Sequence, residues 1–189
     1  MNLITITINN RKILVEDGTS ILNAAKKLNI NIPTLCHLKL HDNKHENHPG
    51  SCRVCVVEVE GRKNLASACC TPVVDGMVVK TNSIKAIKAR RTIVELLLSD
   101  HPQDCLLCEK NTECELQQLA ADMGIKHIKY KGDQNVFKKD ISSYSIVRDL
   151  NKCILCRRCV TMCNEVQTVG VLSPINRGFE TVISPAFES

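Results

Sequence analysis

Cysteine is the residue type that most constrains how this chain can fold. The 189 residues contain twelve cysteines, and eleven of these fall, together with one histidine, into three groups along the sequence. The groups are Cys36, Cys52, Cys55 and Cys69; His101, Cys105, Cys108 and Cys114; and Cys153, Cys156, Cys159 and Cys163. Only Cys70 lies outside them. Because metal ligands recur at such short spacings, each group predicts metal ligation.

A disulfide framework is the alternative explanation for so many cysteines. The N-terminal sequence MNLITITINNRKILVEDG lacks the basic start and long apolar stretch of a secretory signal peptide. No apolar run approaches the roughly 18 residues of a membrane span. Thiols stay reduced in the cytoplasm, where close cysteine spacing indicates metal sites. We therefore expect a cytoplasmic protein with no membrane span, whose cysteines bind metal.

The charge of the chain gives little support for nucleic-acid binding. The formal net charge is +5 with neutral thiols, and metal binding would convert many thiols to thiolates. We therefore expect no nucleic-acid partner. The densest basic stretch comprises Lys85, Lys88, Arg90 and Arg91. It predicts a solvated helix face, with docking to an acidic partner as the alternative.

Residues 1–81 predict an α+β unit. Apolar residues alternate over 4–8, and Asn9-Asn10 predicts a turn into a second strand. Strands are expected at 4–8, 12–15, 52–60, 65–69 and 77–81, with a helix from Asp17 to about Asn29. A hairpin, a helix and then further strands is the order of a β-grasp fold.

The first group has the ligand order of a plant-type [2Fe–2S] ferredoxin. Cys36 leads, Cys52 and Cys55 form C-x2-C, and a distant fourth cysteine follows. Zinc is less favoured because its usual signature is two C-x2-4-C knuckles. The fourth ligand is either Cys69 or Cys70, since adjacent side chains on a strand point in opposite directions.

An insert between the first two ligands is rich in histidine. It contains His37, His41, His45 and His48 among polar loop residues. Metal binding is one interpretation, but the polar neighbours favour a surface loop.

Residues 82–125 predict a small helical domain around the second group. Apolar spacing predicts a helix over 83–99 that begins at Ser83, and a second helix over 112–123. One histidine and three cysteines would suit either a zinc site or an iron–sulfur cluster. The neighbouring iron–sulfur motifs favour a His/Cys3 [4Fe–4S] cluster. Residues 126–147 are polar and predict a linker.

Residues 148–189 contain the C-x2-C-x2-C-x3-C run of bacterial ferredoxins. In that pattern Cys153, Cys156 and Cys159 hold one [4Fe–4S] cluster, and Cys163 ligates another. No second run is present, so this ferredoxin-like domain is expected to be partial and its cluster incomplete in this chain. We expect a helix over 157–165 and a strand near 181–183. A fragment of a larger subunit is favoured over a short subunit completed by a partner.

Four motifs in fixed order resemble the N-terminal iron–sulfur region of iron-only ([FeFe]) hydrogenases and NAD-linked formate dehydrogenases. They are CRVCVVEVEG from Cys52, Cys69-x-Thr71-Pro72, His101-x3-Cys105-x2-Cys108-x5-Cys114, and CILCRRC from Cys153. The region is similar to the iron–sulfur subunit of NADH:quinone oxidoreductase. The resemblance selects Cys69 as the fourth [2Fe–2S] ligand and makes His101 a cluster ligand.

The sequence therefore predicts a module that relays single electrons between a redox partner and a catalytic site. No nucleophile–base set or phosphate-binding loop is present, so no catalytic residues are expected in these residues. The resemblance implies partners in the form of a flavin- or NAD-binding subunit or a ferredoxin, and a C-terminal catalytic domain. The alternative function is a zinc-stabilised interaction module.

Overall fold

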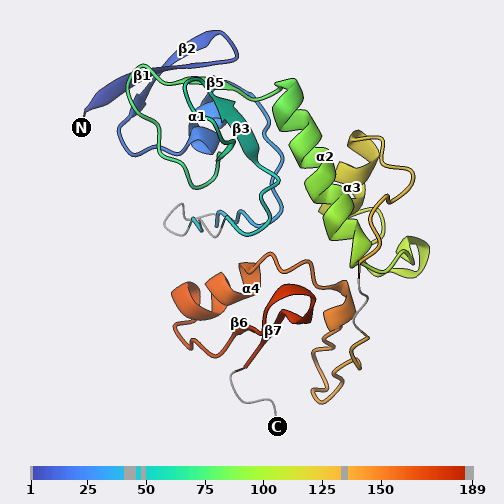
Figure 1. Cartoon of the computed structure of the whole chain (residues 1–189). Helices are drawn as coiled ribbons and strands as arrows, with labels where there is room; N and C mark the ends of the chain where they lie inside the picture. Colours follow the sequence, from blue (N-terminus) through green and yellow to red (C-terminus); the bar gives the residue numbers. More distant parts are fainter. Residues whose placement is uncertain (1, 41–45, 48–49, 133–135, 186–189) are drawn as a thin grey trace. The chain divides into compact units, whose positions relative to one another are not determined.

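The structure, a computed structural model, describes residues 2–40, 46–47, 50–132 and 136–185 (Figure 1). The chain divides into two compact units. The first comprises Met1–His37 and His48–Ile93, and the second comprises Leu38–Asn47 and Val94–Ser189. None of the helices in the described residues has the length and apolar character needed to cross a membrane.

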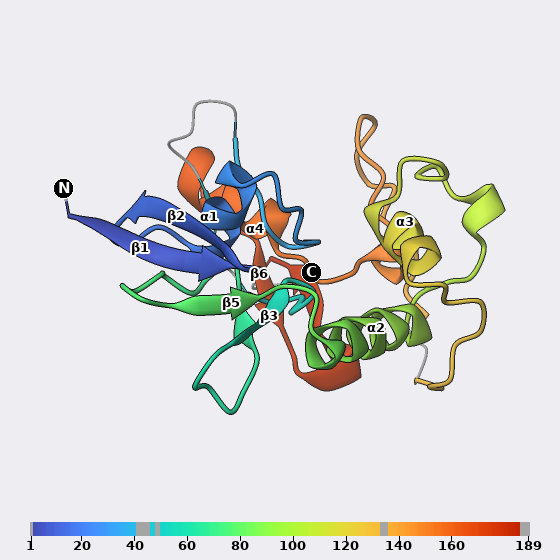
Figure 2. The same ribbon diagram turned by 90° about the horizontal axis from the view of Figure 1, so that it is seen from above.

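The first unit is built on a five-stranded mixed sheet (Figure 2). Its strands lie in the order β2 (Arg11–Glu16), β1 (Leu3–Ile8), β5 (Val78–Lys80), β3 (Val56–Val59) and β4 (Ala66–Ser67). β1 pairs with β5 in parallel, and the other neighbours are antiparallel. Asn9 and Asn10 join β1 to β2 with φ angles of 47° and 65°, which asparagine tolerates and a tight hairpin requires. The predicted hairpin is therefore confirmed.

One short helix packs on this sheet. α1 (Ile21–Lys27) begins at Ser20, whose hydroxyl accepts a hydrogen bond from the backbone of Asn23. Its buried side chains join the core, which includes Ile6, Ile8, Ile21, Leu22, Val57 and Val79. The observed order of hairpin, helix and further strands agrees with the expected order.

The strand predicted at 52–60 is shorter in the structure, because its first residues form a turn. β3 begins only at Val56. Gly50 and Arg53 have φ angles of 56° and 57°, which interrupt an extended path. This leaves Cys52 and Cys55 on a curved loop rather than on a strand.

α2 (Ile84–Ser99) begins after Ser83, as predicted, and the Ser83 hydroxyl accepts a hydrogen bond from Ala86 N. The expectation of a fully solvated basic face is wrong at one position, because Arg90 is buried. Ile84 and Ile87, two of the apolar residues whose spacing predicted this helix, are exposed. The buried face of the helix includes Arg90, whose guanidinium donates to a backbone acceptor, Val56 O.

The second unit has little regular structure. A 3-10 turn (Cys105–Leu107) precedes α3 (Glu115–Asp122), and another (Leu150–Lys152) precedes α4 (Arg158–Thr161), which continues as a π-helical turn over Met162–Val166. β6 (Ser173–Ile175) pairs with β7 (Val182–Ser184); β6 was not predicted. A last 3-10 turn spans Gly178–Glu180.

Candidate metal centres

The structure brings the first group of cysteines together inside the first unit. Cys36, Cys52, Cys55 and Cys69 have exposed fractions of 1%, 7%, 1% and 0%. Cys55 Sγ lies 3.3 Å from Cys69 Sγ, and the Cys36 thiol is hydrogen-bonded to those of Cys52 and Cys69. Four buried sulfur atoms therefore lie in contact, although they come from positions spread between residues 36 and 69.

Strand pairing positions two of these cysteines. Cys55 directly precedes β3, which pairs with β4 through Val56 and Ser67. Ala68 N then donates to Cys55 O, and a turn closes after β4 because Cys70 N and Thr71 N both donate to Ser67 O. Cys69 thus lies in this turn, facing Cys55.

The four thiols are strongly coupled. Hydrogen bonds from Cys52 and then Cys69 hold the pKa of Cys36 far below its usual range, against the opposing effect of burial. The hydrogen bond with Cys69 lowers the pKa of Cys55 to about 7, again against burial. The same hydrogen bonds, with burial, raise the pKa of Cys52 and of Cys69. The site favours thiolate at two positions, and thiolate is the form that binds metal.

Cys70 has different surroundings from Cys69. Cys70 is exposed to solvent, although its Sγ lies 3.3 Å from Cys69 Sγ. A Cβ placed on Gly50 would approach Cys70 Sγ to 2.9 Å. Cys70 therefore packs on the outside of the ligand loop, which supports Cys69 as the inward-facing member of the pair.

The surroundings of the first group suit an iron–sulfur cluster. Ser51 Oγ is buried beside the Cys36 thiol, whose pKa it helps to lower, and it has no other hydrogen-bond partner within the described residues. A sulfur-rich cluster would offer this hydroxyl acceptors. No group of three or more His, Cys, Asp or Glu side chains among the described residues is arranged around a position for a single metal ion. The twelve cysteines, all in the described part of the chain, form no disulfide bond with one another.

Only part of the histidine-rich insert can be compared with its prediction. His37 is buried at 7% exposure, unlike the surface residue that was expected. His41, His45 and His48 lie outside the described residues.

The second group also converges. His101, Cys105, Cys108 and Cys114 line one small cavity together with Asp104 and Gln117. The 3-10 turn over Cys105–Leu107 carries one ligand, and Cys114 caps α3 by accepting from Gln117 N. Burial lowers the pKa of His101, and the charge of Asp104 only partly opposes this. His101 is therefore held in the neutral form that metal ions require.

The third group wraps around a loop with two left-handed residues. Leu155 and Arg157 have φ angles of 54° and 61°. Cys153 and Cys159 are exposed residues, but partial desolvation of their thiols raises the pKa of both, and the neighbouring charge of Cys156 adds to this. These three sulfurs therefore lie close enough to influence one another.

Cys163 differs from the other members of the third group. Hydrogen bonds from the backbone N–H of Leu172, Val171 and Gly170 lower the pKa of its thiol. Cys163 lies in the π-helical turn over Met162–Val166, and its backbone carbonyl accepts a hydrogen bond from Val169 N. Amide groups of the following loop therefore surround the Cys163 thiol, and its charge also acts on Cys159.

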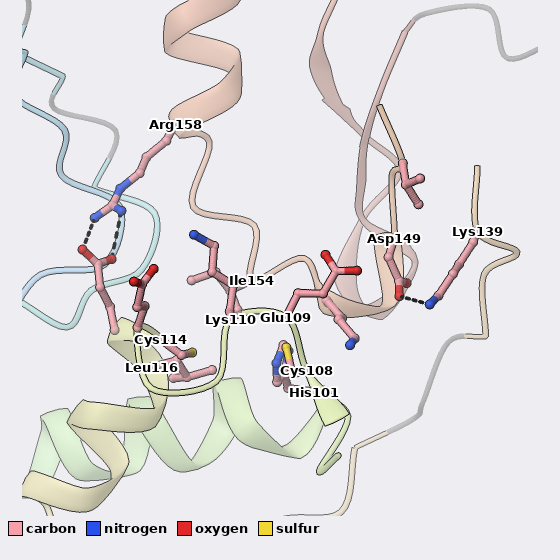
Figure 3. A pocket seen from close by; sticks show the side chains of 14 residues that line it. His101, Cys108, Glu109, Lys110, Cys114, Leu116, Lys139, Asp149, Ile154 and Arg158 are labelled. Carbon is pink, nitrogen blue, oxygen red and sulfur yellow. Dashed lines mark hydrogen bonds and ion pairs between the residues drawn. The ribbon is translucent and has the colours of Figure 1, made fainter. Parts of the chain in front are cut away.

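A cavity of about 480 Å³ lies between the chain segments that carry the second and third groups (Figure 3). Two ion pairs join these segments. Arg158 contacts Glu115 at 2.9 Å, and Lys152 Nζ lies 3.8 Å from Asp104 Oδ2. Each of the four residues is a direct sequence neighbour of a predicted ligand: Asp104 of Cys105, Glu115 of Cys114, Lys152 of Cys153 and Arg158 of Cys159. We did not predict these pairs, although opposite charges beside the ligands were a visible signal.

Two family descriptions match the chain. A "2Fe-2S iron-sulfur cluster binding domain" matches residues 1–83, and an "NADH-ubiquinone oxidoreductase-G iron-sulfur binding region" matches residues 90–129. A solved structure of an NAD+-reducing [NiFe]-hydrogenase in the H2-reduced state aligns with a TM-score of 0.84 and 30% identity. The alignment covers 97% of this chain and 75% of that chain. The chain belongs to the iron–sulfur protein family of NAD(P)-linked hydrogenases and NADH-quinone oxidoreductases.

Curated relatives of this family agree. The HndD subunit of the NADP-reducing hydrogenase of Solidesulfovibrio fructosivorans is 59% identical over 189 residues. A subunit of the NADH-quinone oxidoreductase of Rhizobium meliloti is 39% identical over 184 residues. The match covers 100% and 96% of this chain but only 32% and 21% of those relatives, so the chain spans a third or less of their length.

The resemblance drawn from the cysteine motifs is therefore confirmed. The chain is an iron–sulfur module that combines a [2Fe–2S]-binding domain with a [4Fe–4S]-binding region, and it is similar to one part of larger subunits. Its relatives are subunits of hydrogenase and oxidoreductase complexes.

Proposed function

We propose that this module relays single electrons between a redox partner and the catalytic site of a hydrogenase- or dehydrogenase-type complex. Iron–sulfur clusters, when bound, supply one-electron redox chemistry. The convergence of four buried cysteines in the first unit is the observation that carries this proposal, because these thiols lie in contact at 0–7% exposure. The rest of the chain adds two further cysteine-rich sites.

For the first centre, the proposed ligands of one [2Fe–2S] cluster are Cys36, Cys52, Cys55 and Cys69. The proposed β-grasp domain, residues 1–81, holds these four thiolates and buries them away from water. Low solvent access is one of the factors that set cluster potential.

For the second centre, we assign one [4Fe–4S] cluster to His101, Cys105, Cys108 and Cys114, in a helical domain over residues 82–125. The cavity that these four side chains line supports the assignment, as does the neutral state of His101. A neutral ligand in place of a thiolate removes one negative charge from the site, which favours the reduced state.

For the third group, Cys153, Cys156 and Cys159 would hold part of a further [4Fe–4S] cluster, and Cys163 would serve a neighbouring one. The backbone amide groups that surround the Cys163 thiol support this division. The remaining ligands would come from another segment of a larger subunit or from a partner. Residues 148–189 are then a partial ferredoxin-like domain, reached through a linker over 126–147.

The proposed partners are a flavin- or NAD-binding subunit or a ferredoxin on one side, and a catalytic domain on the other. The relatives' names support this, since they include NADP-reducing and NADH-quinone enzymes. A cytoplasmic location is proposed with it.

Metal content tests the proposal most directly. Anaerobically purified protein should contain iron and acid-labile sulfide, absorb in the visible range and give an electron paramagnetic resonance (EPR) signal on reduction. Variants Cys36→Ser and Cys108→Ser should remove different parts of the spectrum. A colourless protein that contains zinc and no iron would refute the electron-transfer proposal and favour a zinc-stabilised interaction module.

A further inference from the structure

Arg90 is a buried cation in the first unit. Its exposed fraction is 5%, although a guanidinium group stays protonated in proteins. Nε and Nη2 both donate to one acceptor, Val56 O, at 3.0 and 2.7 Å. A carbonyl oxygen carries no formal charge, so these hydrogen bonds do not neutralise the guanidinium.

The ion pairs of the structure do not include Arg90. In the part of the chain that the structure describes, no carboxylate lies within ion-pair distance of its guanidinium. Removing a cation from water without an opposite charge is strongly unfavourable. A source of negative charge is therefore needed near Arg90.

The charged group whose field acts on Arg90 is Cys55, a member of the first cysteine group. Val56 directly follows Cys55, so the carbonyl that anchors Arg90 lies one residue from a buried sulfur. Burial lowers the pKa of Arg90, and the Cys55 thiolate is the charged group that opposes this effect. Four ligand thiolates would supply the missing negative charge.

We propose that Arg90 is the buried counter-charge of the first cysteine group, and that it raises the reduction potential of the cluster held there. This inference rests on the proposed function. Reduction adds one electron and hence one negative charge. A fixed cation stabilises the more negative state, and it does so more effectively in a buried site than in water.

The chain offers a matched set of variants. Arg90→Gln and Arg90→Met remove the charge, and Arg90→Lys keeps it while losing the two-nitrogen contact with Val56 O. Lys88→Gln removes an exposed charge from the same helix and serves as the control. The midpoint potential of the [2Fe–2S] EPR signal is measured in cluster-loaded protein by redox titration.

We expect Arg90→Gln to reduce the equilibrium constant for cluster reduction about tenfold, a fall of about 59 mV for a one-electron couple. Arg90→Lys should retain most of the wild-type potential, and Lys88→Gln should retain all of it. An unchanged potential in Arg90→Gln would overturn the inference. An equal fall in Arg90→Lys would also overturn it, because geometry and not charge would then be responsible.

For variants that fail to assemble the [2Fe–2S] cluster, the cluster content itself is the measurement. If both neutral variants lose the [2Fe–2S] cluster and Arg90→Lys keeps it, the requirement for charge is supported. Loss in all three variants, with Lys88→Gln intact, contradicts a charge role. Iron-free wild-type protein would refute the proposed function, whereas iron-loaded protein with an unchanged Arg90→Gln potential refutes only the role of Arg90.

Discussion

Arg158 and Glu115 form a two-point ion pair, with Nη1 2.9 Å from Oε2 and Nη2 3.3 Å from Oε1. The pair joins α4 to the start of α3 within the second unit. Glu115 directly follows Cys114, and Arg158 directly precedes Cys159. The ion pair therefore joins the two chain segments that carry these predicted ligands.

The stability contribution of this pair should be modest. The two side chains are 30% and 55% exposed, so water screens much of their attraction. A double-mutant cycle with Glu115→Gln and Arg158→Gln should give a coupling energy of about 0.2–1 kcal/mol in urea unfolding. Glu113→Gln, at an exposed neighbouring position, should show no coupling to Arg158→Gln. Equal coupling at both glutamates would contradict a specific pair.

The adjacent cysteines provide a second test. Cys69→Ser should abolish the [2Fe–2S] EPR signal, because Cys69 is fully buried and contacts the Cys55 sulfur. Cys70→Ser should leave the signal in place, since Cys70 is exposed. The iron content of the two variants, purified in parallel, is measured as an independent check on the EPR result. If only Cys70→Ser loses the signal, the ligand assignment is wrong.

A third prediction concerns Gly50, which has a φ of 56° and lies against Cys70. Gly50→Ala should destabilise the fold by more than the about 1–2 kcal/mol of left-handed backbone strain, because the new Cβ would also meet Cys70 Sγ at 2.9 Å. Gly61→Ala is the control for strain alone, since nothing lies within 4 Å of its added Cβ. Thermal and urea unfolding measure both.

Adding Cys70→Ala to Gly50→Ala should remove the destabilisation that comes from the Cys70 Sγ contact, and leave the destabilisation that comes from backbone strain. The double variant should then resemble Gly61→Ala in stability loss. A double variant as unstable as Gly50→Ala would show that Cys70 does not restrict this position.

Asn47 links separate segments of the second unit. Its Oδ1 accepts from Leu38 N, and its Nδ2 donates to Thr161 Oγ1 at 3.2 Å. Asn47→Ala should cost about 1–3 kcal/mol of unfolding free energy, because buried polar groups lose their partners. Thr161→Val removes only the Nδ2 contact and should cost less. A larger loss in Thr161→Val would contradict this arrangement.

Local patterns in the sequence predicted local structure well. Alternation over 4–8 and the Asn9-Asn10 pair predicted the β1–β2 hairpin, because both act over a few residues. Cysteine spacing indicated which sulfurs come into contact in the first group and which side chains line one cavity in the second. Ligation itself stays a prediction, since contact between thiols does not identify the metal.

Features that depend on distant contacts were not predictable in the same way. The apolar spacing of α2 suggested burial of Ile84 and solvation of Arg90, and the structure has the reverse. Arg90 donates to the carbonyl of Val56, which lies 34 positions away in sequence and is not visible in local spacing. β6 has few apolar residues and was missed because its pairing with β7 is what makes it a strand.

The pairing of β3 with β4 also couples the sheet to the cluster site. Val56 lies opposite Ser67, and this register is what brings Cys69 to Cys55. A slip of one residue would turn the β4 side chains to the other face and separate the two sulfurs. A cluster bound to both cysteines is therefore compatible only with the correct strand pairing, and such a cluster would hold the sheet in its native register.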